Sequence, residues 1–379
     1  MIVSASYRTD IPAFYADWFR ARLAAGHADV RNPYGGADYR VDLRAPAVDG
    51  FVFWTRNLEP FSEALDEVAA RDTPFTVQMT ITGYPRALEA SVVDGARAVD
   101  QVRRLAERFG PRAAVWRYDP ILATTATPPD WHRETFARLA GALSGAVDEA
   151  VVSWATIYAK TARNLDAAAR RDGFAWTDPP DAEKAALLAD LAGIAAGHAM
   201  ALTLCAQPNL LEAVGPVGRP PHPSPLPRGE RESGSASFSL SPIEGEGTNS
   251  GPSRTPSPFG GEGWGEGART PTAFEKEEAT SHPTPKAPEN EGAFVPAALR
   301  PARCIDAARL SDVAGRPIAA RTKGNRPGCE CAESRDIGAY DTCPHGCVYC
   351  YAVRSAARAR SAFKAHDPGA EAPLGRSSA

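Results

Sequence analysis

The sequence predicts an α/β fold whose parallel strands close into a (β/α) barrel or partial barrel of the TIM type. Short apolar runs alternate with longer amphipathic stretches along most of the chain. This alternation is typical of parallel strands joined by right-handed helical crossovers. The chain has 379 residues, which is enough for one such domain even after a long segment of biased composition is set aside. A doubly wound open sheet is the alternative.

Six short apolar runs predict buried strands, because each is bounded by turn residues and rich in β-branched or aromatic side chains. They are residues 2–6, 51–54, 75–82, 113–116, 150–154 and 201–205. The stretches between them predict helices at residues 12–25, 59–71, 90–109, 129–143 and 181–199. Pro12 suits the first turn of a helix, and Gly26 suits a left-handed cap at a helix end.

Residues 216–290 differ in composition from the chain on either side. Proline, glycine and serine make up nearly half of them, and the segment has no cysteine. Such a composition buries too little apolar surface to offset the entropy of ordering, so we predict a disordered insertion. A proline-rich docking linker is the alternative. The expected domains are therefore a barrel-like part at residues 1–215, the insertion, and a cysteine-rich module at residues 291–379 that completes the barrel.

Polar side chains follow the predicted strands at the points where the strands end. Because the carboxyl ends of parallel strands meet at one rim, these side chains are candidates for a catalytic site. The candidates are Arg8, Asp10, Arg56, Arg117 and Asp119. The three arginines suit bidentate contact with a carboxylate or phosphate group. The structural alternative is that the two aspartates cap helices and that Arg117 and Asp119 form an ion pair.

Three cysteines near the end of the chain carry the clearest indication of function. Cys343, Cys347 and Cys350 stand in the run Asp-Thr-Cys-Pro-His-Gly-Cys-Val-Tyr-Cys-Tyr. Three thiolates in one loop can bind three irons of a [4Fe-4S] cluster and leave the fourth iron open, whereas four cysteines close the cluster. An open iron indicates catalysis. For His345, inside this loop, we expect a tight turn and a hydrogen bond to a cluster sulfur.

The other four cysteines are enough to close a second metal site. They are Cys205, Cys304, Cys329 and Cys331. We expect either an auxiliary [4Fe-4S] cluster or a zinc ion. The alternative is that Cys205 and Cys304 are ordinary buried residues. The odd count of seven cysteines argues against complete disulfide pairing.

The run from Cys343 to Cys350 resembles the C-x3-C-x-aromatic-C signature of the radical S-adenosylmethionine superfamily. The chain outside the insertion also resembles an uncharacterised bacterial family with a domain of unknown function. That resemblance rests on Ser-x-Tyr-Arg-Thr-Asp-Ile-Pro at the start, on Phe-Trp-Thr-Arg-Asn, on Trp-Arg-Tyr-Asp-Pro and on the closing cysteine-rich run. Spore photoproduct lyase-like proteins are a distant likeness.

The resemblance implies a permuted order of the barrel. In the superfamily the cysteine loop follows the first barrel strand, whereas here only residues 351–379 come after it. A strand near residues 336–340, the cluster loop and a helix from about residue 352 would then replace the usual first unit. This is compatible with a barrel because neighbouring strands need only be adjacent in space.

The resemblance also implies an enzyme that cleaves S-adenosylmethionine at an open [4Fe-4S] cluster and directs a 5'-deoxyadenosyl radical at a substrate. Tyr349, Tyr351 and Trp54 are the expected contacts of the cofactor, and the expected partner is an electron donor of the flavodoxin or ferredoxin type. Nucleic acid is the substrate class that we consider. The net charge of −4 requires any such contact to be local.

Two other functions are open at this point. One is a non-catalytic zinc or iron–sulfur protein whose C-terminal module is structural or binds nucleic acid. The other is a copy that folds but is inactivated by its insertion. The sequence has no run of about 18 apolar residues and no basic region followed by an apolar one at its start. We therefore expect no membrane span and a cytoplasmic protein.

Overall fold

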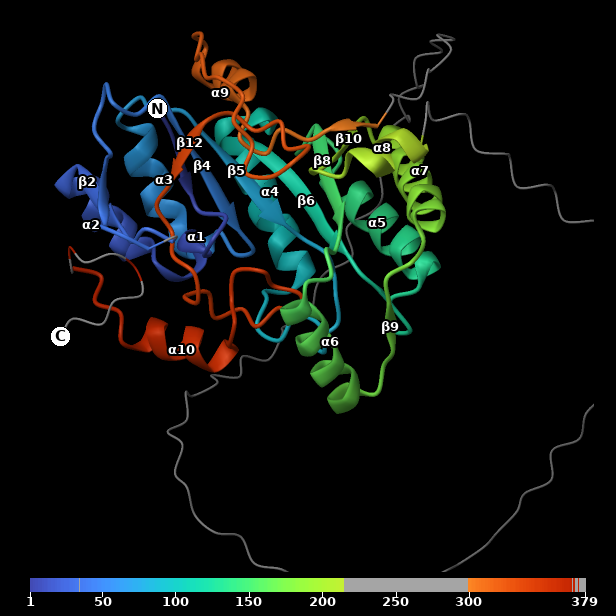
Figure 1. Cartoon of the computed structure of the whole chain (residues 1–379). Helices are drawn as coiled ribbons and strands as arrows, with labels where there is room; N and C mark the ends of the chain where they lie inside the picture. The colour runs from blue at the N-terminus through green and yellow to red at the C-terminus, as the bar shows by residue number, and fades with distance from the viewer. Residues whose placement is uncertain (34, 215–298, 370, 372–373, 375–379) are drawn as a thin grey trace, which may run out of the picture. The chain divides into compact units, whose positions relative to one another are not determined.

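A computed structural model describes residues 1–33, 35–214, 299–369, 371 and 374 (Figure 1). A parallel sheet of eight strands organises them, in the order β11-β10-β8-β6-β5-β4-β1-β12. The strands are β1 (Ile2–Ala5), β4 (Gly50–Thr55), β5 (Phe75–Thr80), β6 (Ala114–Ile121), β8 (Glu149–Trp154), β10 (Ala201–Leu204), β11 (Arg300–Pro301) and β12 (Ser334–Asp336). The α/β class, the parallel sheet and all six strands predicted from apolar runs are confirmed. The predicted insertion at residues 216–290 lies outside the described residues.

The strands follow one another across the sheet in chain order, with one exception. β12 pairs with β1, from Ile2 opposite Ser334 to Ser4 opposite Asp336, while the other side of β1 pairs with β4. Within the described part of the chain, β11 and β12 are the two edges of the sheet. The strand predicted near residues 336–340 thus forms slightly earlier, and it lies beside the first strand of the chain.

The helices lie largely where amphipathic stretches predict them. They are α1 (Ile11–Phe14), α2 (Ala16–Ala25), α3 (Ser62–Ala69), α4 (Gly95–Phe109), α5 (Pro129–Leu143), α6 (Ala159–Asp172), α7 (Asp181–Gly197), α8 (Pro208–Val214), α9 (Ala307–Ala314) and α10 (Ala356–Lys364), with 3-10 turns η1 (Glu59–Phe61) and η2 (Pro111–Ala113). Two short antiparallel pairs, β2 (His27–Val30) with β3 (Tyr39–Asp42) and β7 (Ala123–Thr124) with β9 (Trp176–Thr177), flank the sheet.

Two predicted helices differ from the observed ones for local reasons. The helix predicted at residues 12–25 breaks at Tyr15, whose ψ of 31° lies outside the helical range and whose buried hydroxyl donates to the carbonyl of Thr342 at 2.7 Å. The helix predicted at residues 90–109 begins only at Gly95, because the Asp94 side chain caps it there. The residues before Asp94 instead form a loop that meets the C-terminal cysteines.

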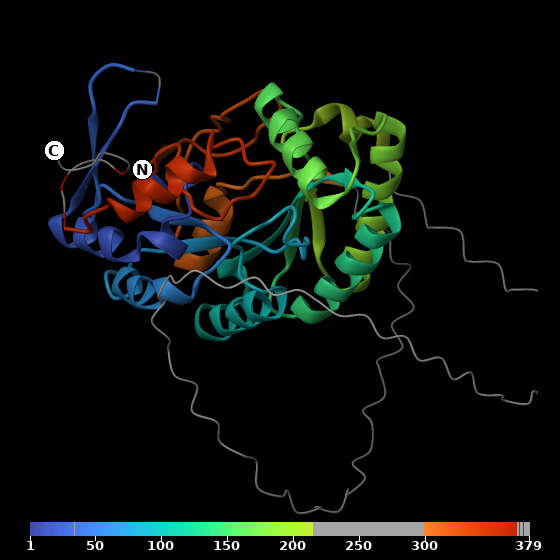
Figure 2. The same cartoon turned by 90° about the horizontal axis from the view of Figure 1, so that it is seen from below.

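Alternate residues of the strands face two separate cores, as the period of a strand requires. One face packs Val3, Phe53 and Trp116 in the same core as buried residues of α2, α3, α4, α5 and α7. Figure 2 shows helices of this layer along one side of the sheet. The other face, here called the inner face, packs Ile2, Val52, Val115 and Val151 against residues between Ala302 and Ala332. None of the helices that the structure describes has the length and hydropathy of a membrane span.

Candidate functional site

Cys343, Cys347 and Cys350 lie in the loop between β12 and α10, at the carboxyl end of the sheet (Figure 1). This loop pairs with the connection between β5 and α4. The amide of Val348 donates to the carbonyl of Leu88 at 3.0 Å, and the amide of Ser91 donates to the carbonyl of His345 at 2.9 Å. The cysteine loop is therefore fixed by backbone hydrogen bonds to a segment far away in sequence.

The three thiols of this loop are partly buried and lie within electrostatic reach of one another. Burial raises the pKa of Cys343, and the charges of Asp10, Cys350 and Cys347 raise it further. Burial raises the pKa of Cys347 to about 12, against the opposing effect of Arg56. Burial also raises the pKa of Cys350, which backbone hydrogen bonds from Ala352 and Val353 oppose. Three thiolates in this place need a compensating cation.

No group of three or more His, Cys, Asp or Glu side chains within the described ranges has the arrangement of a site for a single metal ion. The three thiols share one loop without converging on one point. A cubane cluster does not require such convergence, since each thiolate binds a different iron. The donor set, three neighbouring thiols of one loop, fits an iron–sulfur cluster in its chemistry.

Asp10 and His345 join the start of the chain to the cysteine loop. His345 Nε2 lies 2.7 Å from Asp10 Oδ2, and both side chains are buried. Asp10 also accepts hydrogen bonds from the amides of Ala13 at 2.9 Å and Arg56 at 2.8 Å. Asp10 thus caps α1, as its structural alternative predicts, and orients the histidine of the loop as well.

A buried network around Glu89 holds the second half of the loop. The Glu89 carboxylate accepts hydrogen bonds from Arg56 Nη1 at 2.8 Å, from Thr82 Oγ1 at 2.7 Å and from the hydroxyl of Tyr349. Arg56 Nη2 donates to the same tyrosine hydroxyl at 2.6 Å. Tyr349, an expected cofactor contact, stands between Cys347 and Cys350 in the sequence. Its hydroxyl is part of a structural network with Arg56 and Glu89 that holds the loop. Glu89 was not among the predicted site residues, and its position beside a predicted helix start was the only signal in the sequence.

Arg8 forms a buried ion pair with Asp336 of β12. Its Nε donates to Asp336 Oδ1 at 2.8 Å and its Nη2 donates to the Asp336 carbonyl at 2.8 Å. Ser4 and Ser6 donate to the same carboxylate at 2.8 and 2.7 Å. This aspartate, which was also not predicted as a site residue, connects β1 to the strand that carries the cysteine loop.

All three predicted arginines have an acidic partner. Besides Arg8 with Asp336 and Arg56 with Glu89, Arg117 pairs with Asp119 on β6. Burial alone would lower the pKa of Arg117, but Asp119, Cys304 and Cys205 hold it well above its ordinary value. An anionic ligand would therefore have to compete with these carboxylates. Arg117 and Asp119 thus form the ion pair that the structural alternative predicts.

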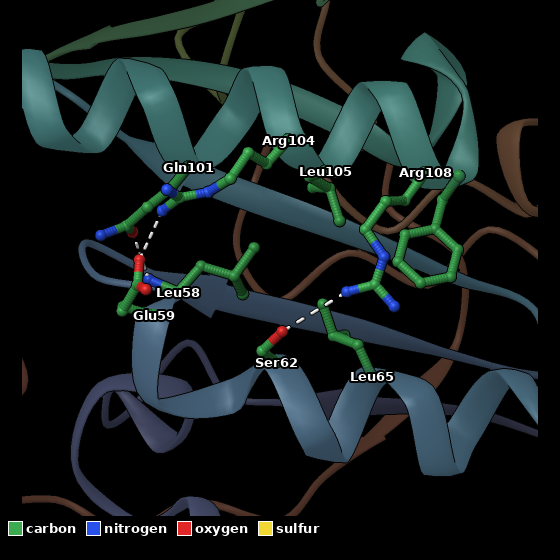
Figure 3. A pocket seen from close by; sticks show the side chains of 9 residues that line it. Leu58, Glu59, Ser62, Leu65, Gln101, Arg104, Leu105 and Arg108 are labelled. Carbon is green, nitrogen blue, oxygen red and sulfur yellow. Dashed lines mark hydrogen bonds and ion pairs between the residues drawn. The ribbon is translucent and has the colours of Figure 1, made fainter.

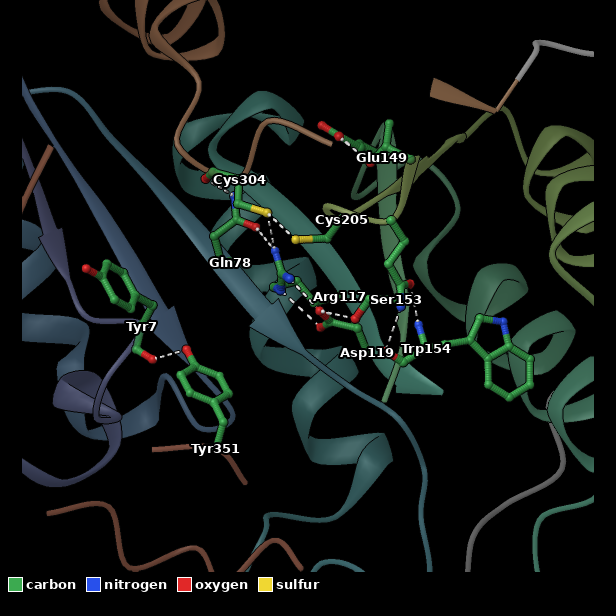
Figure 4. Close-up of polar contacts among 12 residues, drawn as sticks. Tyr7, Gln78, Arg117, Asp119, Glu149, Ser153, Trp154, Cys205, Cys304 and Tyr351 are labelled. Carbon is green, nitrogen blue, oxygen red and sulfur yellow. Dashed lines mark hydrogen bonds and ion pairs between the residues drawn. The ribbon is translucent and has the colours of Figure 1, made fainter. Parts of the chain in front are cut away.

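The other expected cofactor contacts, Trp54 and Tyr351, both lie beside Tyr7. The ring of Trp54 lies 4.9 Å from the Arg117 guanidinium, and its Nε1 donates to Ser4 Oγ at 3.1 Å. Tyr351 is half exposed, and its hydroxyl donates to the carbonyl of Tyr7 (Figure 4). Of the two, Tyr351 is the aromatic side chain that remains accessible beside the cysteine loop.

The remaining cysteines meet on the inner face of the sheet. Cys205 follows β10 and Cys304 follows β11, and their sulfurs lie 3.7 Å apart (Figure 4). Cys331 contacts Cys304 through its thiol and also contacts Cys329. The Cys329 pKa is lowered to about 6, mainly by the hydrogen bond from Cys331, whereas the pKa of Cys331 is raised to about 11. The structure thus brings together the four cysteines that the sequence grouped.

Comparison with known families places the chain. The profile described as "Domain of unknown function (DUF1848)" matches residues 2–217 and 285–352. The chain belongs to this family. No curated protein matches it. The DUF1848 match spans β1 to the three-cysteine loop, and its interruption falls within residues 216–290, the segment of biased composition.

Two small cavities lie beside α4 of the DUF1848 domain. One, of about 120 Å³, is lined by Arg56, Thr82, Tyr84 and Glu89 among others, so it adjoins the network that holds the cysteine loop. The other, of about 100 Å³, lies between α3 and α4, where Gln101, Arg104 and Arg108 face Glu59 and Ser62 (Figure 3). The second cavity contains none of the predicted site residues, so the first is the one relevant to the candidate site.

Proposed function

We propose that this protein is a radical S-adenosylmethionine enzyme in which Cys343, Cys347 and Cys350 hold an open [4Fe-4S] cluster. The observation that carries the proposal is the placement of these thiols. They lie together in one partly buried loop, at the carboxyl end of a parallel sheet, where α/β proteins concentrate their catalytic residues. The C-x3-C-x2-C spacing leaves one iron of a cubane without a protein ligand.

The strand order supports a partial (β/α) barrel with a permuted start. β12 pairs with β1 and precedes the cysteine loop, while the other strands follow in chain order. If β12 is counted first, the order becomes β12-β1-β4-β5-β6-β8-β10-β11. The cysteine loop then follows the first strand of the barrel, as in the superfamily that its sequence resembles.

The chain's own residues would hold the loop and exclude water from it. When bound, the cluster and S-adenosylmethionine would supply a 5'-deoxyadenosyl radical for hydrogen abstraction from a substrate. The Asp10–His345 contact and the Glu89–Arg56–Tyr349 network fix both halves of the loop from buried positions. Such fixed surroundings favour a single orientation of the bound groups.

The accessible side of the loop is the proposed entrance for ligands. Tyr351 is half exposed there, and Lys160 of α6 donates to its carbonyl. An aromatic ring and a cation at an opening suit a nucleotide or another planar anionic compound. Nucleic acid is a substrate class consistent with this entrance, and a flavodoxin or ferredoxin is the proposed electron donor.

The test is the yield of 5'-deoxyadenosine from protein purified and reconstituted without oxygen, after addition of dithionite and S-adenosylmethionine. We expect the nucleoside to form, and we expect Cys347→Ala to abolish it and to lower the iron content by about four atoms per chain. Ser62→Ala is the control, since Ser62 is an exposed residue of α3 outside both groups of cysteines. Equal nucleoside yields from the Cys347→Ala variant and the unsubstituted protein would refute the proposal. Protein that binds zinc alone would favour the non-catalytic alternative.

A further inference from the structure

The four cysteines outside the loop form a continuous series of sulfur contacts. Cys304 Sγ lies 3.7 Å from Cys205 Sγ, and Cys331 contacts both Cys304 and Cys329. The two ends of the series, Cys205 and Cys329, lie close enough for the charge of one to act on the other. All four belong to the core on the inner face of the sheet, with Cys304 and Cys331 buried and the other two partly buried.

The turn that presents Cys329 and Cys331 is built tightly. The amide of Lys323 donates to the carbonyl of Cys331 at 2.9 Å, and the amide of Cys329 donates to the carbonyl of Arg326 at 3.1 Å. A Cβ at Gly324 would lie 2.1 Å from the carbonyl oxygen of Cys329, so only glycine fits there. The amide of Ala332 donates to the carbonyl of Ile305 at 2.8 Å. The turn is thereby held beside Cys304.

Positive charge and hydrogen-bond donors surround these sulfurs. Arg117 Nη1 donates to Cys304 Sγ at 2.9 Å, Arg326 Nη2 donates to Cys205 Sγ at 3.4 Å, and the amide of Ile305 donates to Cys331 Sγ at 3.5 Å. Figure 4 shows Arg117 pointing at Cys304 and Cys205. Four thiolates with one divalent ion carry two negative charges. Arg326 offsets part of that charge, while Arg117, whose charge is shared with Asp119, contributes a hydrogen bond to sulfur. Donors of this kind around ligand sulfurs are typical of metal sites.

The spacing of the sulfurs distinguishes between the two metals that suit four thiolates. Zinc binds thiolate at about 2.3 Å, so two sulfurs of a tetrahedral zinc site lie about 3.8 Å apart. In a [4Fe-4S] site each sulfur binds a different corner of a cube, and the sulfurs must stand further apart. The observed 3.7 Å between Cys205 and Cys304 matches the tetrahedral edge. The four thiols do not converge on one point in the structure, so binding requires a side-chain movement. We propose that Cys205, Cys304, Cys329 and Cys331 bind a single zinc ion, for which the two end thiols, Cys205 and Cys329, turn toward each other.

A zinc ion there would have a structural role. It would join the end of β10, the segment after β11 and the Cys329–Cys331 turn, which lie on both sides of residues 215–298 in the sequence. Four protein ligands leave no open position for a substrate, as in structural zinc sites. This inference is independent of the proposed function, because it concerns different thiols and a different metal.

Zinc and iron are counted in protein expressed with both metals and purified without oxygen, and X-ray absorption at the zinc edge gives the ligands. We expect about one zinc per chain, with four sulfur neighbours at about 2.3 Å. Cys304→Ser should lose the zinc and keep the iron of the other loop, whereas Cys347→Ser should lose iron and keep the zinc. If Cys304→Ser fails to fold, Cys329→Ser replaces it, because Cys329 is less buried. The X-ray absorption spectrum is recorded on the unsubstituted protein and so does not depend on either variant.

Two results would overturn the inference. One is about eight irons per chain with no zinc, which would indicate a second cluster. The other is zinc that Cys304→Ser and Cys329→Ser retain but Cys347→Ser loses, which would place the ion in the three-cysteine loop. A protein that holds zinc in the four thiols but produces no 5'-deoxyadenosine would support the zinc site and refute only the proposed function.

Discussion

At the scale of single residues, the site depends on buried charges that have partners from distant parts of the chain. Glu89 is 3% exposed and lies against Arg56, which is 9% exposed. Removing one member of such a pair leaves the other charge buried without compensation, which costs about 3–5 kcal/mol. Exposed pairs contribute about 0–1 kcal/mol. The same substitution should therefore have very different effects at the two kinds of position.

Glu89→Gln should lower the free energy of unfolding by about 3 kcal/mol, because the buried guanidinium of Arg56 loses its charged partner. It should also shorten the lifetime of the bound cluster, since Tyr349 then donates to a neutral amide oxygen, a weaker acceptor than the carboxylate. Urea denaturation measures the first effect, and loss of visible absorbance with time measures the second. Glu59→Gln, in the exposed pair of Glu59 with Arg104, is the matched control and should change stability by less than about 1 kcal/mol. Equal effects of the two substitutions would contradict this account.

His132 predicts a pH dependence of stability. Burial lowers its pKa in the folded protein to about 4, from the ordinary value of 6.5. Above pH 6.5 the imidazole is neutral in both states. Between pH 6.5 and about 4 only the unfolded chain binds the proton, so stability falls as the pH falls, by at most about 1.4 kcal/mol per pH unit.

The measurement is the free energy of unfolding of His132→Gln between pH 7 and pH 4, relative to the unsubstituted protein. The variant should lose less stability than the unsubstituted protein over this window. Tyr118→Phe is the control: it removes the hydroxyl 2.8 Å from His132 Nδ1 but keeps the burial, so it should keep the dependence. Parallel curves for His132→Gln and the unsubstituted protein would show that this histidine does not titrate as described.

At the scale of elements, glycine conformation determines where α2 ends. Gly26 follows α2 with φ of 77°. This left-handed conformation is unfavourable for residues that have a Cβ. A Cβ there would also lie 2.7 Å from the side chain of Arg44. Gly26→Ala should therefore destabilise the protein by about 1–2 kcal/mol. Gly193 lies inside α7, and a Cβ there would meet nothing within 4 Å, so Gly193→Ala should stabilise by about 0.5–1 kcal/mol. Thermal unfolding of both variants checks the opposite signs; shifts of the same sign would contradict the assignment.

The elements themselves were predictable where their signals are local. The helix at residues 129–143 has the predicted bounds, because Pro129 suits a helix start and the apolar pattern continues to Leu143. The division of helix 12–25 at Tyr15 was not predictable, since it depends on a hydrogen bond to Thr342, more than 300 residues away. α6 was missed because only Thr161, Leu165 and Ala168 of its side chains are buried, too few for a clear apolar stripe.

The same distinction applies to the candidate site. Cysteine spacing separated the loop of three from the group of four, and the structure brings the members of each group together. The positions that follow predicted strands identified Arg8, Arg56 and Arg117 as site candidates. They did not identify Asp336 and Glu89, the acids that pair with Arg8 and Arg56. Glu89 and Asp336 become partners only through the pairing of the cysteine loop with the β5–α4 connection and of β12 with β1. Contacts between distant segments are absent from local patterns.

At the scale of the whole molecule, the sheet and the group of four cysteines use residues on either side of residues 216–290. The loop of three cysteines lies after that segment and is held by residues before it, such as Asp10. The pairing of β1 with β12 and of β10 with β11 involves no residue of that segment, and the family match is interrupted there. Deleting residues 216–290 should therefore leave the metal content and the yield of 5'-deoxyadenosine unchanged. Metal analysis and nucleoside assay of the shortened protein check this. A gain of activity on deletion would instead support the reading that the insertion inactivates this copy.

The central claim is that the loop of Cys343, Cys347 and Cys350 leaves one iron open to S-adenosylmethionine. Electron paramagnetic resonance of the reduced protein, prepared without oxygen, tests it most directly. The account predicts a [4Fe-4S] signal that changes when S-adenosylmethionine is added and that is lost in Cys350→Ser. The absence of an iron–sulfur signal in protein reconstituted with iron and sulfide, or a signal that S-adenosylmethionine leaves unchanged, would contradict it.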